Sequence, residues 1–212
     1  SENLMKKVFG NEIKELKFFN YKHYSFKGVK HLISKTGYSK QGGYEIHIEN
    51  IVSGLELYDY FFKIGKDFNL KPGAPNLIER IEGGLLSYGN DMDNRDNPYE
   101  CGFDKYINVD SDVLFLGKDK LKEIKLKGVN RKLMGVLIES DKINLTKEEK
   151  LYDEKNNDIG ILRSAAFSPK FKKIVGIAMI NKAFWNMPGN LKIDIEGKVK
   201  LGKICKLPFP KL

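Results

Sequence analysis

The C-terminal part of the sequence restricts the fold most strongly. From residue 132 onward, short apolar runs such as KLMGVLIES, KIVGIAMI and LKIDIEG are separated by stretches rich in turn residues. Runs of this length at this spacing are typical of small β-barrels and β-sandwiches. The sequence therefore predicts an all-β domain at residues 127–212, with the boundary near residues 125–130.

The first half indicates a mixed α and β domain at residues 1–126. Two strand-like runs, ELKFFNYKHYSF and VKHLISKTGY, meet at a turn at Lys27–Gly28, and a third, GYEIHIE, follows. The segment IVSGLELYDYFFKIGKDF has a helical apolar period. The segment APNLIERIEGGLLSYG predicts a second helix, with Pro75 near its start and Asn76 as a candidate cap.

Two further segments join this half to the all-β domain. The stretch NDMDNRDNPYECGFD is too polar and too rich in turn residues for regular structure, so we expect a loop, where functional residues are common. The segment GKDKLKEIKLKG predicts a connecting helix that ends at Gly128.

Composition limits the class of protein. Of the 212 residues, 41% are hydrophobic and 31% are charged, which predicts a folded globular chain. No apolar run is long enough to span a bilayer, and the first residues lack the apolar core of a signal peptide. Cys101 and Cys205 are far apart and match no metal spacing, so we expect reduced thiols in a cytoplasmic protein.

Charge is distributed unevenly. In residues 1–109, 15 Lys and Arg balance 15 Asp and Glu, whereas residues 110–212 contain 22 against 13 and so hold the whole net charge of +9. A basic half would suit an anionic partner. Most of the basic residues are lysines without interleaved aromatics, so we expect solvated surface, and no nucleic-acid or membrane partner.

The segment GYSKQGGYEIHIEN contains the first candidate site. Successive side chains of a strand point to opposite faces, so Glu45 and His47 are expected on one face and Ile46 on the other. A carboxylate directly after a Gly-Gly pair can accept two hydrogen bonds from a planar donor edge, such as a guanidinium or a pterin. Taken alone, Glu45 is better explained as a solvent-facing carboxylate.

The segment LIERIEGGLLSYGND contains the second candidate site. Arg80 and Glu82 are expected on adjacent faces of a helix, followed by Gly83–Gly84 and Ser87. Each Gly inside a helix costs about 1 kcal/mol relative to Ala. Close approach of a ligand and close packing against the sheet explain the pair equally well.

Metal sites and covalent catalysis find no support in the sequence. Asp91, Asp93 and Asp96 lack the Gly and the terminal Glu of a calcium-binding EF-hand loop. The three histidines are scattered without zinc-ligand spacing. No motif marks a nucleophile, so we identify no catalytic residue and expect no metal.

Taken together, the segments resemble one family over essentially the whole chain. They occur in the order seen in the folate-dependent aminomethyltransferase, or glycine-cleavage T-protein, family: GYSKQGGYEIHIEN, LIERIEGGLLSYGNDMDNRDNPYECGFDKYI, FLGKDKLKEIKLKG, IGILRSAAFSPKFKKIVGIAMI and LPFPK. The wording SKQGGYE and DNRDNPYECG is closest to the members that demethylate dimethylsulfoniopropionate. Only the last portion of the family is covered, so we expect a fragment that lacks part of the folate cleft.

This resemblance implies an α+β fold: a ferredoxin-like, folate-binding portion at residues 1–126 and a C-terminal β-barrel domain at residues 127–212. It implies transfer of a methyl group from a small sulfonium substrate to N5 of tetrahydrofolate. Because the sulfonium is already activated, the protein needs mainly to align the reactants and exclude water. The chain could also form a homodimer, which the resemblance leaves open.

The resemblance also assigns roles to five residues. Glu45, Arg80 and Ser87 would bind folate, with Glu45 facing the donor edge of the pterin and Arg80 holding folate or orienting Glu82. Tyr38 would hold the sulfonium by cation–π attraction, where the demethylases usually have Trp. His47 would also bind the substrate. It stands where the demethylases have Tyr, so the identity of the substrate is not fixed by the resemblance.

Two other functions stay open beside methyl transfer from a sulfonium. One is the aminomethyltransferase reaction of glycine cleavage, with a lipoyl carrier protein as partner; its members usually have TGEDGYE where this chain has SKQGGYE. The other is folate binding without catalysis.

Overall fold

The computed structural model describes residues 1–38, 42–74 and 77–209, so Pro75 and Asn76 lie outside the described residues. The chain forms two compact units, Ser1–Asn76 (unit 1) and Leu77–Leu212 (unit 2). Each unit has its own elements and core, and each is described by itself.

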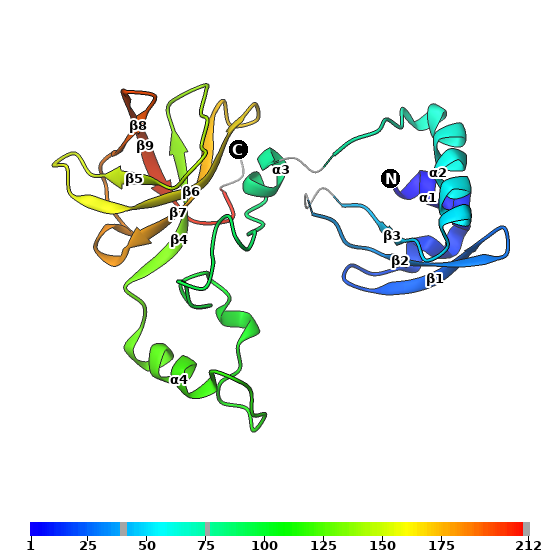
Figure 1. Cartoon of the computed structure of the whole chain (residues 1–212), viewed down its shortest axis with the longest axis horizontal. Helices are drawn as coiled ribbons and strands as arrows, with labels where there is room; N and C mark the ends of the chain where they lie inside the picture. Colours follow the sequence, from blue (N-terminus) through cyan, green and yellow to red (C-terminus); the bar gives the residue numbers. More distant parts are fainter. Residues whose placement is uncertain (39–41, 75–76, 210–212) are drawn as a thin grey trace. The chain divides into compact units, whose positions relative to one another are not determined.

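Unit 1 is a three-stranded antiparallel sheet with helices on one face (Figure 1). The strand order is β1-β2-β3. Its elements are α1 (Glu2–Phe9), η1 (Asn11–Glu15), β1 (Tyr21–Phe26), β2 (Val29–Ser34), β3 (Glu45–His47), α2 (Ile51–Gly65) and η2 (Lys66–Phe68).

The two faces of this sheet differ in exposure, as the alternation of side chains requires. Ile33 is buried and Ile46 packs beside it. Their cluster includes side chains from α1, η1, β1 and α2 and from the segments just after η1 and just before β3 (Met5, Phe9, Ile13, Leu16, Tyr24, Tyr44 and Phe61). The predicted turn at Lys27–Gly28 joins β1 to β2, because Phe26 pairs with Val29. The sheet therefore has one face in the core and one open face.

Unit 2 is built around a closed antiparallel barrel of six strands, which confirms the expected β-barrel. The strand order is β4-β7-β6-β5-β8-β9, closed by pairing of β9 with β4. Its elements are α3 (Leu77–Glu82), η3 (Asp104–Tyr106), α4 (Lys118–Lys127), β4 (Arg131–Ile138), β5 (Glu149–Tyr152), β6 (Asp158–Ser168), β7 (Lys173–Asn181), η4 (Lys182–Phe184), β8 (Leu191–Ile195) and β9 (Lys198–Cys205).

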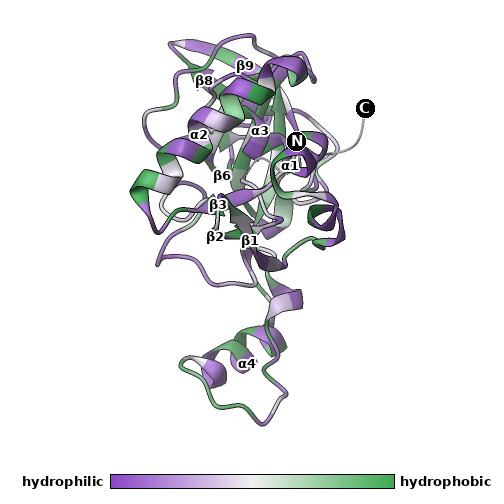
Figure 2. Cartoon of the chain, turned by 90° about the vertical axis from the view of Figure 1, so that its right-hand side faces the viewer, coloured by the Kyte–Doolittle hydropathy of each residue, from purple (hydrophilic) through white to green (hydrophobic). Residues whose placement is uncertain are grey.

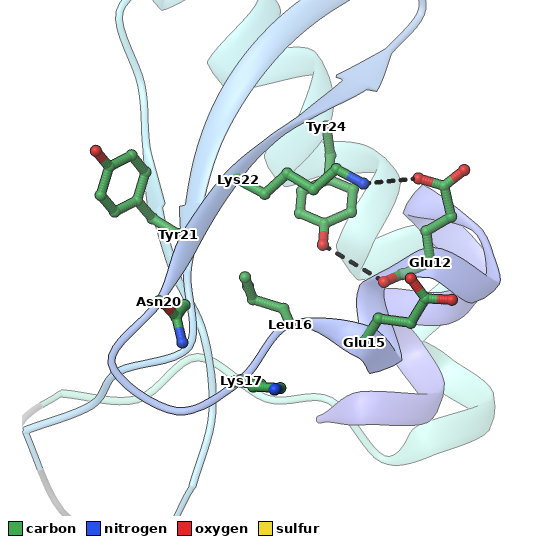
Figure 3. A pocket seen from close by; sticks show the side chains of 8 residues that line it. All are labelled: Glu12, Glu15, Leu16, Lys17, Asn20, Tyr21, Lys22 and Tyr24. Carbon is green, nitrogen blue, oxygen red and sulfur yellow. Dashed lines mark hydrogen bonds and ion pairs between the residues drawn. The ribbon is translucent and has the colours of Figure 1, made fainter.

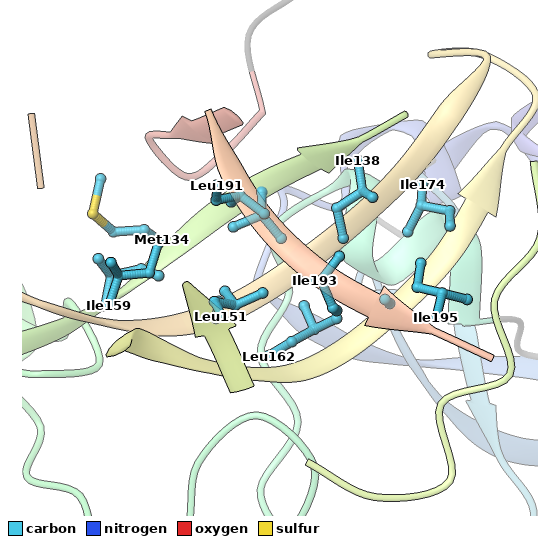
Figure 4. Packing of buried hydrophobic residues seen from close by; sticks show 13 residues of the cluster. Met134, Ile138, Leu151, Ile159, Leu162, Ile174, Leu191, Ile193 and Ile195 are labelled. Atoms are coloured by element: carbon cyan, nitrogen blue, oxygen red, sulfur yellow. The ribbon is translucent and has the colours of Figure 1, made fainter. Parts of the chain in front are cut away.

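The barrel interior is filled by aliphatic side chains, as the apolar runs predict (Figure 4). Every barrel strand contributes at least one residue to this cluster, and Ile204, the contribution of β9, is only partly buried. The residues labelled in Figure 4 are Met134, Ile138, Leu151, Ile159, Leu162, Ile174, Leu191, Ile193 and Ile195. A small barrel closed in this way is packed by its own side chains and has no sheet edge.

The second predicted helix is much shorter than expected. The pattern predicts helix over residues 74–89, whereas α3 ends at Glu82. Gly84 has φ +62° and lies against Pro208, so the backbone turns there in a conformation that other residues rarely adopt. The chain therefore leaves the helical conformation at this turn, and Gly84 packs against the segment that follows β9. The two explanations considered for the Gly-Gly pair both stay predictions.

The connecting helix agrees with its prediction, since α4 ends at Lys127 and Gly128 caps it. The apolar residues 113–116 precede α4, where Figure 2 shows hydrophobic stretches in the chain next to the helix. Leu114 and Leu116 are exposed. Because α3 packs on β6 and β7, residues 77–126 belong with the barrel in unit 2. The domain boundary at residues 126/127 stays a prediction. No helix in the described ranges is long and apolar enough to cross a membrane.

Candidate functional site

The open face of the sheet in unit 1 brings several polar side chains into two rows. Residues directly opposite each other on neighbouring strands are close enough to interact. In one row, Tyr21 pairs with Ser34 and Ser34 pairs with Glu45. The second row lies two residues away on each strand and consists of His23, Leu32 and His47.

Glu45 and His47 are both exposed on this face, while Ile46 is partly buried on the other, which confirms the predicted alternation. β3 is shorter than the predicted strand and ends at His47, so Glu49 lies beyond it. Before β3, Gly42 and Gly43 have φ values of +77° and +152°. The backbone there takes a conformation that favours glycine, and a Cβ at either position would meet no atom of the described chain within 4 Å.

The Glu45 carboxylate is held by a neighbouring hydroxyl. Thr36 Oγ1 donates a hydrogen bond to Glu45 Oε2. Ser34 Oγ lies 2.8 Å from Thr36 Oγ1. Ser34 and Thr36 were not identified as site residues from the sequence. Their spacing of two residues at the end of a strand is consistent with both lying on the face of Glu45. A carboxylate has about four acceptor positions, so the contact with Thr36 leaves capacity for a ligand.

The histidines have different surroundings. His23 and His47 are exposed on the open face, whereas His31 is buried and its Nε2 lies 2.9 Å from Ser53 Oγ. Tyr38 is exposed, in the segment just before residues 39–41, which lie outside the described residues. Within the part of the chain that the structure describes, no three His, Cys, Asp or Glu side chains gather to hold a metal ion.

Arg80 in unit 2 has a buried setting that the sequence did not indicate. Its side chain is 1% exposed and forms an ion pair with the fully buried Asp91, with 2.7 Å between Nη1 and Oδ2. Nη1 also donates to the carbonyl of Leu85 at 3.2 Å, and Nη2 donates to Ser164 Oγ at 2.9 Å. These contacts give Arg80 a structural role in unit 2. Its contact with folate stays a prediction.

Glu82 and Ser87 lie on either side of the turn that follows α3. Ser168 Oγ donates to Glu82 Oε1, so Glu82 contacts β6 and Arg80 contacts Asp91. Ser87 is partly exposed, and its Oγ accepts a hydrogen bond from Asn90 Nδ2 at 2.9 Å. Its role in ligand binding stays a prediction.

A β-bulge in β6 directs side chains of the barrel toward the acidic loop, residues 90–104. The pairing with β7 shifts between Leu162 and Ser164, so Arg163 is the extra residue. Ser164 then contacts Arg80, and the Arg163 guanidinium lies 3.1 and 3.2 Å from the two carboxylate oxygens of Asp96. A bulge can re-aim side chains in this way, and a register shift is not visible in an apolar pattern.

The acidic residues of the loop are paired with arginines. The Asp96 side chain is fully buried and also contacts Arg131 Nη2 at 3.1 Å, while Arg131 Nε lies 2.9 Å from Glu100 Oε1. Arg95 contacts Asp93 at 2.6 Å and Glu148 at 2.5 Å. These contacts fasten the loop to the barrel.

These pairs predict acid-sensitive stability. Hydrogen bonds from Arg95 hold the pKa values of Asp93 and Glu148 below their ordinary values of 3.8 and 4.5. A carboxyl whose pKa is lower in the folded state stabilises the fold above its unfolded pKa, and this stabilisation is lost as pH falls through the folded pKa. We expect the free energy of unfolding to fall below about pH 4.5, and less steeply in Arg95→Met. Urea denaturation at pH values from 7 to 2 measures the free energy of unfolding. An equal dependence on pH in wild type and Arg95→Met would contradict this prediction.

The two cysteines are expected to be unreactive in the folded protein. Cys101 is buried and Cys205 is partly buried, and burial raises the pKa of each thiol to about 11. The thiolate is the reactive form, so little of it is present at neutral pH. We expect slow labelling by a thiol-specific reagent at pH 7.5 and complete labelling of both thiols in denaturant. Rapid labelling of Cys101 in native buffer would contradict the buried setting.

A groove on unit 1 is lined in part by Tyr21 of the first polar row (Figure 3). It has a volume of about 320 Å³ between η1 and β1 and is lined by residues such as Glu12, Lys22 and Tyr24. Lys22 Nζ pairs with Glu12 Oε2 at 3.1 Å, and the Tyr24 hydroxyl lies 3.5 Å from the Glu12 carbonyl. The groove contains none of the five predicted site residues, so we place the candidate site on the open sheet face instead.

Curated relatives and a solved structure resemble this chain over most of its length. The dimethylsulfoniopropionate demethylase of Ruegeria pomeroyi is 37% identical over 92% of this chain and 52% of its own length. The aminomethyltransferase of Thermoanaerobacter pseudethanolicus is 32% identical over 93% of this chain and 54% of its own. The chain thus spans about half the length of these relatives.

The fold agrees with a solved structure. The crystal structure of the glycine cleavage system aminomethyltransferase T from Bartonella henselae matches 98% of this chain and 56% of its own, with a TM-score of 0.83 at 21% identity. Two family models also match: the GCVT N-terminal domain at residues 1–111 and the glycine cleavage T-protein C-terminal barrel domain at residues 131–211. The chain therefore belongs to the glycine-cleavage T-protein family.

Proposed function

We propose that this chain is part of a tetrahydrofolate-dependent methyltransferase that takes the methyl group from dimethylsulfoniopropionate. The observation that carries the proposal is the exposed Glu45 carboxylate, held by Thr36 on the open sheet face of a T-protein fold. The likeness to the Ruegeria pomeroyi demethylase supports the choice of donor. The products would be 5-methyltetrahydrofolate and methylmercaptopropionate, and we place the reaction in the cytoplasm.

The reaction needs little from the protein beyond placement. The nitrogen N5 displaces a neutral thioether from the sulfonium: the carbon–sulfur bond breaks, a carbon–nitrogen bond forms, and the N5 proton goes to solvent. Alignment and exclusion of water can supply most of the required acceleration. This agrees with a chain in which we identify no nucleophile.

Each predicted site residue takes a role in this proposal. Glu45 accepts hydrogen bonds from the donor edge of the pterin, because an ionised carboxylate is an acceptor with two oxygens. Tyr38 offers an aromatic face to the sulfonium. His47, which shares a sheet face with Glu45, also binds the substrate and can donate a hydrogen bond to it. In unit 2, Ser87 and Arg80 are proposed to contact folate, and the ion pair with Asp91 holds the Arg80 side chain in place.

Two alternative functions belong to the same family. The 32% identity to an aminomethyltransferase favours the glycine-cleavage reaction as the second candidate, with a lipoyl carrier protein as partner. The third is folate binding without turnover, since the chain spans about half the length of its relatives. A homodimer is also compatible with the proposal.

A labelled methyl group separates these candidates. The chain is incubated with tetrahydrofolate and methyl-deuterated dimethylsulfoniopropionate, and labelled 5-methyltetrahydrofolate is measured by mass spectrometry. The proposal expects label in the folate at a rate above that of the reagents alone. Formation of 5,10-methylenetetrahydrofolate from an aminomethyl-lipoyl carrier instead would identify the glycine-cleavage reaction. Folate binding with neither product would identify the non-catalytic alternative.

A further inference from the structure

We propose that Thr36, backed by Ser34, is a positioning residue that fixes the orientation of the Glu45 carboxylate. The inference rests on the proposed function of Glu45 as the folate-recognising residue. It adds a part that neither the sequence pattern nor the likeness to known proteins assigns, namely a chain of two hydroxyls that ends on the carboxylate.

The direction of the hydrogen bonds follows from the chemistry of the three groups. An ionised carboxylate only accepts, so Thr36 Oγ1 must donate its single proton to Glu45 Oε2. Thr36 Oγ1 then has no proton left for Ser34 Oγ, 2.8 Å away, and must accept one from it. The order of donation is therefore Ser34 to Thr36 to Glu45. Hydrogen bonds in a chain polarise one another, which strengthens the last one.

The backbone brings these groups together. β2 ends at Ser34, which pairs directly with Glu45 on β3, and Thr36 lies two residues further along the chain. Ser34 and Thr36 are half-buried, whereas the Glu45 side chain is exposed. The two hydroxyls thus form a fixed support beneath a side chain that would otherwise be free to move.

The support matters because a long exposed side chain is costly to order. Glu is among the side chains that lose most conformational entropy when they are fixed. When the fold orders the side chain in advance, ligand binding avoids that cost, and affinity rises without any new contact to the ligand. Loss of the Thr36 hydroxyl should therefore weaken folate binding without any need for contact between Thr36 and folate.

The test compares Thr36→Val, which removes the hydroxyl at nearly constant shape, with Thr36→Ser, which keeps it. Affinity for tetrahydrofolate is measured by calorimetry. We expect Thr36→Val to bind about 3- to 10-fold more weakly, because ligand binding must then order the Glu45 side chain. We expect Thr36→Ser to bind within about 2-fold of wild type. Thr146→Val, at an exposed threonine in unit 2, is the matched control and should bind as wild type does.

A double-variant comparison shows whether Thr36 acts through Glu45. In a Glu45→Gln background, Thr36→Val should cause little further loss, because the carboxylate that it orients is already gone. Equal losses in both backgrounds would overturn the positioning role. The positioning role would also be overturned if Thr36→Val bound folate as tightly as wild type while Glu45→Gln bound it more weakly.

A second readout needs no folate and so separates this inference from the proposed function. Scalar couplings in the unliganded chain report the χ1 rotamers of Glu45. We expect one dominant rotamer in wild type and in Thr36→Ser, and averaged couplings in Thr36→Val. Averaged couplings in wild type would overturn the inference whether or not folate binds. Absence of folate binding with an ordered Glu45 would overturn the proposed function alone.

Discussion

Replacement of Arg80 by methionine is expected to lower the free energy of unfolding by about 3–5 kcal/mol. The guanidinium is 1% exposed and pairs with Asp91, whose side chain is fully buried. Removal of one partner leaves the other charge buried without compensation, which is far more costly than loss of a surface pair. Without Arg80, Asp91 Oδ2 would keep the hydrogen bond from the Ser87 backbone N–H at 2.7 Å, and Oδ1 makes none within the described residues.

Urea denaturation followed by the fluorescence of Trp185 measures this effect, because the only tryptophan of the sequence packs against the barrel core. Lys150→Met is the matched control: it removes a surface ion pair with Asp158 on the same barrel, and a change of about 1 kcal/mol or less is expected. A double variant, Arg80→Met with Asp91→Leu, should recover part of the loss. A change below about 1 kcal/mol in Arg80→Met would contradict the structural role.

Replacement of Glu45 by glutamine is expected to weaken tetrahydrofolate binding by about 10- to 100-fold. A hydrogen bond to a charged group contributes about 1.5–3 kcal/mol. Glutamine has nearly the same shape, but its amide replaces one acceptor oxygen with a donor, which would face the donor edge of the pterin. The loss should therefore appear in affinity with little change in stability.

Glu49→Gln is the matched control for this variant. Glu49 is exposed just beyond the end of β3, so the same change of charge is made four residues away without touching the predicted site. We expect Glu49→Gln to bind within about 2-fold of wild type. If both variants lose the same affinity, the effect is one of net charge and the role of Glu45 in recognition is wrong.

Much of the fold could be predicted from local patterns. The barrel strands follow short apolar runs between turns, and the connecting helix ends at Gly128 as its capping pattern indicates. The alternation of Glu45, Ile46 and His47 in exposure also follows from strand geometry. These features depend on neighbouring residues alone, so the sequence contains the information they need.

Features that depend on distant contacts were not predictable. The turn at Gly84 that follows α3 lies against Pro208, which is far away in the sequence. The burial of Arg80 depends on Asp91 and on Ser164, which a bulge in β6 brings into place. A single arginine in a helical pattern gives no indication of such partners.

The candidate site was predicted only in part, for a similar reason. Residue types and the family resemblance pointed to Glu45, but the support from Ser34 and Thr36 depends on the pairing of β2 with β3. Register between strands is set by the whole sheet and by the connecting loop. Two hydroxyl residues at a strand end are too common to single out without that register.

Calorimetric titration of the wild-type chain with tetrahydrofolate tests the central claim most directly. The account predicts saturable binding to one site per chain, with an affinity that falls in Glu45→Gln and is retained in Glu49→Gln. No saturable binding in wild type, or equal binding in wild type and Glu45→Gln, would contradict the claim that the open face of this sheet recognises folate.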